Sequence, residues 1–399
     1  MKNYVAFKAC PRNISYSPAF TIVELLVVIV VIGILAAIST ISYNGITSKA
    51  VVASLQSDLS NASKQLEMYK IENGAYPTAN KCPTTSPTEI CLKASNDNTF
   101  TYKANTNPPS FTLTESNANG IEKYITDKNA IPTSEVNQTF NATSTGSTGT
   151  IQTWTVPITG SYVIDAYGAQ GGYSYLLSTN TINPGGKGAW IKGTFNLTAG
   201  QVISILVGQP GYDYANNFRA GGGGGGTFIT NKEDGTLLIA AGGGGGAGQY
   251  VTTPAANGQS GTDGGSGTKG PGPSFVAGGI SGAGGGTSTY SGGGGGWLTN
   301  GIDSTNYGKG GKSFSNNGEG GVGYRSDRLT PTIDGGFGGG GGAYAGGGGG
   351  GGYSGGGAGG WLSSSSGNGG GGGSFNGGDN QSNTAGDRIG SGLVIIKSQ

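Results

Sequence analysis

The sequence predicts an α+β protein made of two unlike parts. A long N-terminal helix with a small antiparallel sheet comes first, and an all-β, glycine-rich part follows. Three observations support this prediction. An apolar run opens the chain, and apolar residues at helical spacing continue it. Short alternating segments bounded by turn residues follow. Only 6 of the 86 glycines lie before residue 151.

The apolar run over residues 20–41 is about as long as a helix needs to be to cross a bilayer. Lys2, Lys8 and Arg12 precede it, and few charges follow it, which places the N-terminus in the cytoplasm and the rest of the chain outside. Glu24 is a lone carboxylate near the start of the run. A charge in such a segment is costly without a cationic partner, so Glu24 is a candidate functional residue.

The stretch AFTIVE and the apolar run after it resemble the N-terminal signal of type IV pilins and type II secretion pseudopilins. The resemblance implies a leader over 1–19, cut after Ala19 by a prepilin peptidase, and N-methylation of Phe20. It also implies that Glu24, the fifth residue counted from Phe20, pairs with such an N-terminal amine during filament assembly. The family prefers Gly where this chain has Ala19. The alternatives are an ordinary signal anchor and a conventional secretory signal, and nothing like the small-residue cleavage site of the latter follows the run.

The helix is expected to continue beyond the apolar run. Gly74 is a predicted C-cap and Pro77 a stop, while Asn44-Gly45 interrupts the pattern. The stretch LEMYKIENGAYPT over 66–78 resembles the end of the long helix in pilins and pseudopilins. The apolar stripe of this helix, expected to pack on a sheet, consists of Val51, Leu55, Leu59, Ala62, Leu66 and Tyr69.

A small antiparallel sheet is predicted next, with turns at Pro108-Pro109 and Asn119-Gly120. Its strands are expected at 99–104, 110–114 and 121–126. Together with the helix they form a predicted pilin-like domain over 20–131.

The chain has three cysteines, and Cys10 lies in the predicted leader. Cys82 and Cys91 lie in a segment predicted to be outside the membrane, where a disulfide between them is the natural interpretation. Their spacing does not suit zinc, and the chain has no histidine to complete a site.

Residues 132–150 are rich in Ser, Thr, Asn and Gly and are predicted to be a linker. Beyond them, 151–399 form the glycine-rich domain, with a hairpin turn predicted at 231–235. Apolar strands are expected at 153–157, 162–167, 189–197, 202–207, 227–229, 237–241 and 393–397. The glycine runs end in large residues that a packed core needs, namely Trp297, Phe337, Tyr344, Tyr353, Trp361 and Phe375.

The order of TWTVPITGSYVIDAYGAQGG, ILVGQPG, LLIAAGGGGGAG and GGFGGGGG resembles the extracellular glycine-rich region of the anaplastic lymphoma kinase and leukocyte tyrosine kinase receptors. The resemblance implies a jelly-roll-like β-sandwich that carries a bundle of packed polyglycine helices, and a surface for recognition. Such extended helices have no internal hydrogen bonds, and only Gly lets their backbones approach on every side. Six blocks are candidates: 221–226, 242–246, 292–296, 338–342, 346–352 and 369–373.

The composition argues against several kinds of chemistry. Without histidine there is no Ser-His or Cys-His arrangement and no His-ligated metal, so no enzyme, cofactor or metal is expected. Residues 151–399 carry 11 basic and 11 acidic side chains, which argues against a nucleic-acid partner. Two acidic groups are candidate calcium ligands, although solvated turns are the preferred interpretation: Asp213 with Asn216 and Asn217, and Glu233 with Asp234.

The leading hypothesis is a minor pilin of a type IV pilus. It starts as a precursor in the inner membrane and then displays 151–399 on the extracellular pilus or cell surface as an adhesion or recognition domain. Its expected partners are the prepilin peptidase, other pilin subunits, the inner membrane, and a cell-surface protein or glycan receptor. The alternative is a pseudopilin of a type II secretion or DNA-uptake machine. A third hypothesis is an envelope-anchored structural protein that never enters a filament.

Overall fold

The computed structural model describes residues 22–399 apart from ten short stretches. The chain divides into two compact units, Met1–Ser54 and Leu55–Gln399. The stretches outside the described residues are 107–108, 119, 129–132, 134, 177–180, 214–219, 250–254, 269–274, 325–331 and 363–364.

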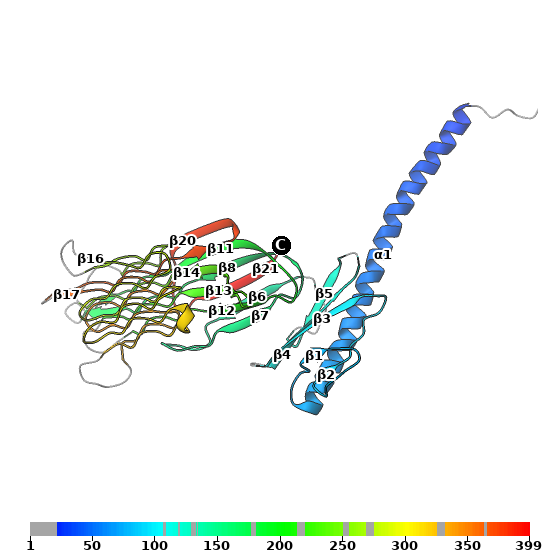
Figure 1. The fold of residues 1–399 in the computed structure, drawn as a ribbon. Helices are drawn as coiled ribbons and strands as arrows, with labels where there is room; N and C mark the ends of the chain where they lie inside the picture. The colour runs from blue at the N-terminus through cyan, green and yellow to red at the C-terminus, as the bar shows by residue number, and fades with distance from the viewer. Residues whose placement is uncertain are drawn as a thin grey trace, which may run out of the picture. The chain divides into compact units, whose positions relative to one another are not determined.

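One long helix, α1, runs over Ile22–Asn73 and continues through Asn44-Gly45, where the sequence pattern is interrupted (Figure 1). It ends as predicted at Gly74, which has φ of +76° and donates its N–H to the carbonyl oxygen of Lys70 at 2.8 Å. Among the described residues, no helix combines the length and the apolar character that a membrane span requires. The predicted span over 20–41 extends beyond those residues and stays a prediction.

The small antiparallel sheet that follows has the order β3-β4-β5, as the sequence predicts: β3 is Thr99–Thr106, β4 Pro109–Ser116 and β5 Glu122–Thr126. The apolar stripe of α1 covers it, because Leu59 and Leu66 are fully buried in one cluster with residues of β4 and β5. A short parallel pair, β1 (Ala79–Asn80) and β2 (Glu89–Ile90), completes this small domain, which we call the head. The cluster consists of Leu59, Ala62, Leu66, Tyr76, Leu92, Phe111, Leu113 and Ile125.

Two five-stranded antiparallel sheets follow, and they pack face to face around one core (Figure 1). Alternation places apolar side chains inside: in β8, Tyr162, Ile164 and Ala166 are buried, while their neighbours are partly exposed. The first sheet has the order β20 (Asp379–Arg388), β11 (Gly188–Leu197), β8 (Gly160–Tyr167), β21 (Leu393–Ser398) and β6 (Asn137–Asn141). The second has the order β19 (Phe375–Asn376), β14 (Leu237–Ala241), β13 (Thr227–Asn231), β12 (Val202–Leu206) and β7 (Gln152–Thr155).

The segment 132–150, which the sequence predicts to be a linker, instead contributes β6 to the first sheet. Asn137–Asn141 pairs along its length with β21, and Phe140 packs against the shared core. Val136, directly before β6, is itself buried in that core. The linker prediction fails here because a strand at a sheet edge buries few side chains and needs no regular apolar pattern.

The expected apolar strands of the glycine-rich part appear as β7, β8, β11, β12, β13, β14 and β21. The hairpin turn between β13 and β14 is also present: Gly235 has φ of +73° and donates its N–H to the carbonyl oxygen of Asn231 at 3.0 Å. Short pieces are β9 (Ser174–Leu176), β10 (Thr181–Asn183), β15 (Gly267–Thr268), β16 (Phe275–Val276), a 3-10 turn at Phe314–Asn316, β17 (Trp361–Leu362) and β18 (Ser365–Ser366).

The glycine runs lie side by side, with no helix or strand assigned through most of their length (Figure 1). Their backbones hydrogen-bond to one another rather than within a run. Gly223 donates to Gly341, Gly341 to Gly349, and Gly243 to Gly351, at 2.8–2.9 Å. Each run thus finds partners for its N–H and C=O groups in its neighbours, which a buried segment requires.

Candidate functional site

The residues predicted to act in processing and assembly lie at the edge of what is described. Ala19 and Phe20 are outside the described residues. Glu24 lies in the first turns of α1, and its side chain is also outside them. Their roles in cleavage, methylation and assembly therefore stay predictions.

The head carries the predicted disulfide. Cys82 and Cys91 are bonded, with their Cα atoms 4.9 Å apart. Asn80 also fixes the loop that they close, because it accepts a hydrogen bond from the N–H of Leu92 and donates one to the carbonyl oxygen of the same residue. The loop is thus tied to the buried Leu92 of the head.

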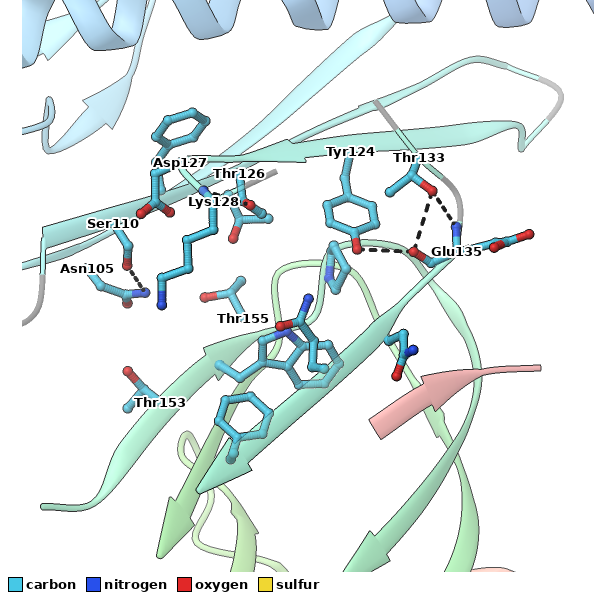
Figure 2. A pocket seen from close by; sticks show the side chains of 17 residues that line it. Asn105, Ser110, Tyr124, Thr126, Asp127, Lys128, Thr133, Glu135, Thr153 and Thr155 are labelled. Atoms are coloured by element: carbon cyan, nitrogen blue, oxygen red, sulfur yellow. Dashed lines mark hydrogen bonds between the residues drawn. The ribbon is translucent and has the colours of Figure 1, made fainter. Parts of the chain in front are cut away.

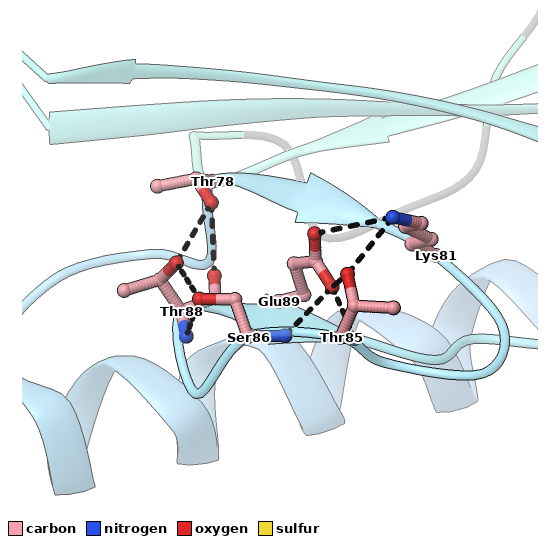
Figure 3. Close-up of polar contacts among 6 residues, drawn as sticks. All are labelled: Thr78, Lys81, Thr85, Ser86, Thr88 and Glu89. Carbon is pink, nitrogen blue, oxygen red and sulfur yellow. Dashed lines mark hydrogen bonds and ion pairs between the residues drawn. The ribbon is translucent and has the colours of Figure 1, made fainter.

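A polar network lies inside the disulfide loop (Figure 3). The Glu89 carboxylate accepts hydrogen bonds from the N–H of Thr85 at 2.6 Å and of Ser86 at 3.1 Å, and Lys81 lies 3.9 Å from it. The bond from the Thr85 N–H is the main reason why the pKa of Glu89 is lowered. Beside it, the Thr78 hydroxyl donates to the Thr88 carbonyl oxygen. These contacts shape the loop.

A buried carboxyl group lies between α1 and the sheet. Glu115 of β4 is fully buried, and its Oε1 accepts a hydrogen bond of 2.9 Å from Asn98. Burial raises the pKa of Glu115 to about 8, and the neighbouring charge of Asp58 adds to the rise. Asp58 in turn accepts hydrogen bonds from the N–H and the hydroxyl of Ser95. At neutral pH the Glu115 carboxyl is therefore mostly protonated.

The head and the two sheets meet within the unit Leu55–Gln399. The Thr114 hydroxyl donates to the carbonyl oxygen of Pro157, and the Thr159 N–H donates to the Glu122 carboxylate at 2.8 Å. Tyr124 of β5 is buried in the core that the two sheets share, and burial raises its pKa. The β4-β5 face is thus partly covered by the glycine-rich part.

A cavity of about 440 Å³ lies beside these contacts. Figure 2 shows Thr153 and Thr155 on one side of it, and Asn105, Ser110 and Lys128 on the other. A volume of this size is within the range of small-molecule sites, which often lie where two structural parts meet. The sequence does not predict this cavity, because the residues that line it come from strands and strand ends that lie far apart in the chain. The lining residues are Asn105, Ser110, Phe111, Thr112, Tyr124, Thr126, Asp127, Lys128, Thr133, Glu135, Asn137, Gln138, Phe140, Thr153, Trp154, Thr155 and Pro157.

The large residues at the ends of the glycine runs gather in two clusters. The first is a packing core around Phe228 and Phe337, both almost fully buried. Trp297, Tyr353 and Phe375 pack against it as partly buried side chains, as the sequence predicts for a folded domain.

The second cluster consists of tyrosines and one tryptophan, all partly exposed. Tyr307 stacks on Tyr344 at 4.5 Å and on Tyr290 at 5.3 Å between ring centroids. Tyr324 and Trp361 approach the stack with their rings steeply inclined, the latter at 76° to Tyr290. We call these five residues the tyrosine cluster. The sequence predicts a packed core for Tyr344 and Trp361 from their places at the ends of glycine runs, and both lie partly exposed in this cluster. No such pattern marks Tyr290, Tyr307 and Tyr324.

Of the candidate calcium ligands, Asp213 accepts a hydrogen bond of 2.7 Å from the N–H of Tyr173. Asn216 and Asn217 lie outside the described residues. Asp234 accepts a hydrogen bond from the N–H of Thr236 in the hairpin turn, as a solvated turn residue does. Across the described part of the chain, no three His, Cys, Asp or Glu side chains are grouped as a metal site requires.

Comparison with known families gives a match at the N-terminus. The family model of the prokaryotic N-terminal methylation motif matches residues 15–40, a stretch that contains Ala19, Phe20 and Glu24. This match agrees with the sequence prediction for the start of the chain.

Curated relatives are similar over a short part of the chain. Type II secretion system core protein G of Dickeya chrysanthemi is 39% identical over 75 residues, which are 17% of this chain and 49% of that protein. The proteins of the same description from Escherichia coli K12 and Klebsiella pneumoniae are 40% and 41% identical over 62 and 59 residues. Those stretches cover 16% and 15% of this chain, and 43% and 42% of the two relatives. The chain thus spans less than half the length of these relatives. The methylation motif and this similarity together support the assignment of the N-terminal part of the chain as pilin-like.

Proposed function

We propose that the protein is a minor subunit of a type IV pilus that displays its glycine-rich part as a recognition domain on the cell surface. The observation that carries the proposal is the pairing of a methylation motif over 15–40 with a large folded part beyond residue 151. The first supplies the means of entering a filament. The second is far larger than the three-stranded head needs for its own stability.

In this proposal a prepilin peptidase removes residues 1–19, and Phe20 becomes the methylated N-terminus. The helix over 20–41 holds the precursor in the inner membrane and then packs in the filament core. Glu24 forms an ion pair with the N-terminal amine of another subunit, because a carboxylate in an apolar core requires a cation. The protein acts by binding and not by catalysis.

For the glycine-rich part we propose a jelly-roll-like sandwich that carries a bundle of polyglycine helices. The two sheets around one core support the first element. The hydrogen bonds between glycine runs support the second. The resemblance to the glycine-rich region of the two receptor kinases favours both the sandwich and the polyglycine bundle. It also favours a role in recognising a partner outside the cell.

Two measurements test the proposal. Antibody against residues 151–399, with immunogold electron microscopy, is expected to label filament tips. A Glu24→Ala variant is expected to abolish this label while membrane levels of the protein stay normal. Glu72→Ala changes an exposed glutamate near the other end of α1 and serves as the matched control. Label confined to the cell body in the unmodified protein would overturn the proposal.

A second candidate is a pseudopilin of a type II secretion or DNA-uptake machine, and the similarity to core protein G favours it. The large domain would then contact secreted cargo or the secretion channel. Loss of secretion or DNA uptake in a deletion strain, with surface attachment unchanged, would support this candidate over the first.

A further inference from the structure

The cavity is bounded by strands of three sheets. β6 is the last strand of one five-stranded sheet and β7 the last strand of the other, and β4 and β5 of the head supply the third wall. Gln152 of β7 donates a side-chain hydrogen bond to the carbonyl oxygen of Asn141 of β6, so the two edge strands are held together beside the cavity. The walls are thus built on strands rather than on loops alone.

Three threonine hydroxyls line this cavity without a protein partner. Within the part of the chain that the structure describes, the hydroxyls of Thr112, Thr153 and Thr155 form no hydrogen bond. Thr155 is only 4% exposed as a residue, but none of the three hydroxyls is among the fully buried side-chain atoms that lack a partner. The hydroxyls are therefore open to the cavity, and a ligand that enters it can bond to them in place of water.

The rest of the lining fits an uncharged, hydroxyl-rich ligand. Phe140, which is partly exposed, adds aromatic surface, whereas Trp154 and Tyr124 are almost fully buried in the core. Asn137 adds an amide that can donate and accept. The charged residues are of both signs, two carboxylates and one ammonium, so the cavity does not select a strongly charged ligand. The charged members are Asp127, Glu135 and Lys128.

We propose that this cavity binds a neutral oligosaccharide. The threonine hydroxyls and the amide pair with sugar hydroxyls, and the ring of Phe140 contacts the apolar face of a sugar ring. The inference rests on the proposed function, because it names the class of ligand that a surface-displayed recognition domain of this kind takes. An extended peptide added along the open edges of β6 and β7 is the competing occupant.

The test uses the full chain, purified in detergent. It is applied to a printed panel of neutral oligosaccharides of glucose, galactose and N-acetylhexosamines, with sulfated and sialylated counterparts. Neutral members are expected to bind, and calorimetry then gives the affinity.

Thr112→Val, Thr153→Val and Thr155→Val each remove one hydroxyl at nearly constant volume and are expected to weaken binding about two- to tenfold. Thr139→Val, on the exposed part of β6 and outside the cavity, is the matched control and leaves the affinity unchanged.

Three results would overturn the inference. They are binding of charged oligosaccharides alone, no binding of any neutral member, and binding that all three cavity variants leave unchanged. If Thr155→Val alters the fold, the other two variants, which are at partly exposed positions, still test the inference.

Filament labelling by antibody is a separate readout. Labelled filaments without sugar binding refute only this inference, and sugar binding without filaments refutes the proposed function.

Discussion

The backbone N–H of Gly223 donates a 2.9 Å hydrogen bond to the carbonyl oxygen of Gly341, so two glycine runs distant in sequence touch through their main chains. A Cβ on Gly223 would overlap the carbonyl oxygen of Gly349 and lie 3.1 Å from the nitrogen of Gly341. Those backbone atoms are held by hydrogen bonds of their own and have little room to move. Close approach of neighbouring runs is therefore what requires glycine at this position.

Gly223→Ala is expected to lower the free energy of unfolding of the glycine-rich part by about 1–3 kcal/mol, the usual cost of overpacking a tight interior. Tryptophan fluorescence measures this unfolding selectively, because all four tryptophans lie beyond residue 151. Gly261→Ala is the control, since nothing lies within 4 Å of a Cβ there. Equal stability of the two variants would show that the runs are not packed as described.

The disulfide is expected to stabilise the head. Replacing Cys82 and Cys91 together by serine removes a cross-link that closes a loop of about ten residues, which costs roughly 2–3 kcal/mol. Thermal unfolding followed by far-ultraviolet circular dichroism, which reports on α1, measures the loss. Dithiothreitol is expected to destabilise the unmodified protein to a similar extent and to leave the double variant unchanged. A double variant as stable as the unmodified protein would contradict this role.

The sequence predicted most of the regular structure, because the relevant signals are local. The C-cap at Gly74, the three strands of the head and the apolar strands such as β8 follow from spacing, turn residues and alternation. The fully buried side chains of the helix stripe, Leu59 and Leu66, likewise lie where their spacing predicts.

What the sequence did not predict depends on contacts between distant segments. β20 has the sequence DNQSNTAGDR and is largely exposed, so no alternation marks it, and only backbone pairing with β11 makes it a strand. The sequence predicts a linker where β6 lies for a similar reason, since this edge strand has no regular apolar pattern. The cavity gathers Thr112, Thr153 and Thr155 from two strands that only tertiary structure brings together.

The buried Glu115 predicts a pH-dependent stability of the head. Its pKa rises from 4.5 to about 8 on folding. Between these values the unfolded chain binds fewer protons than the folded one, so stability falls as the pH rises through this range, by at most about 1.4 kcal/mol per pH unit. Glu115→Gln is expected to remove this fall and to be more stable than the unmodified protein at pH 8. Denaturant unfolding at several pH values measures it, with Glu72→Gln at an exposed site as control.

The tyrosine cluster is expected to stabilise the ends of the glycine runs. Tyr307 stacks on Tyr344 and Tyr290, and each aromatic pair is worth about 0.5–1.5 kcal/mol beyond the area that it buries. Tyr307→Ala should therefore lower the free energy of unfolding by about 1–3 kcal/mol, whereas Tyr307→Phe keeps the rings and costs little. Tryptophan fluorescence during denaturant unfolding again gives the values. If the Tyr307→Ala protein were as stable as the Tyr307→Phe protein, the tyrosine cluster would not contribute to the packing of the glycine-rich part.

The C-terminal strand β21 is an interior strand of its sheet, because it pairs with both β8 and β6. Ile396 is fully buried in the shared core, whereas Ile389, a few residues earlier, is 64% exposed. Ile396→Ala is expected to cost about 2–5 kcal/mol through lost burial and the cavity left behind, and Ile389→Ala less than about 0.5 kcal/mol. Because β21 connects β6 to the rest of the sheet, hydrogen exchange in β6 should also rise in Ile396→Ala. If hydrogen exchange in β6 were as slow in Ile396→Ala as in Ile389→Ala, contacts other than those with β21 would hold β6 in the sheet.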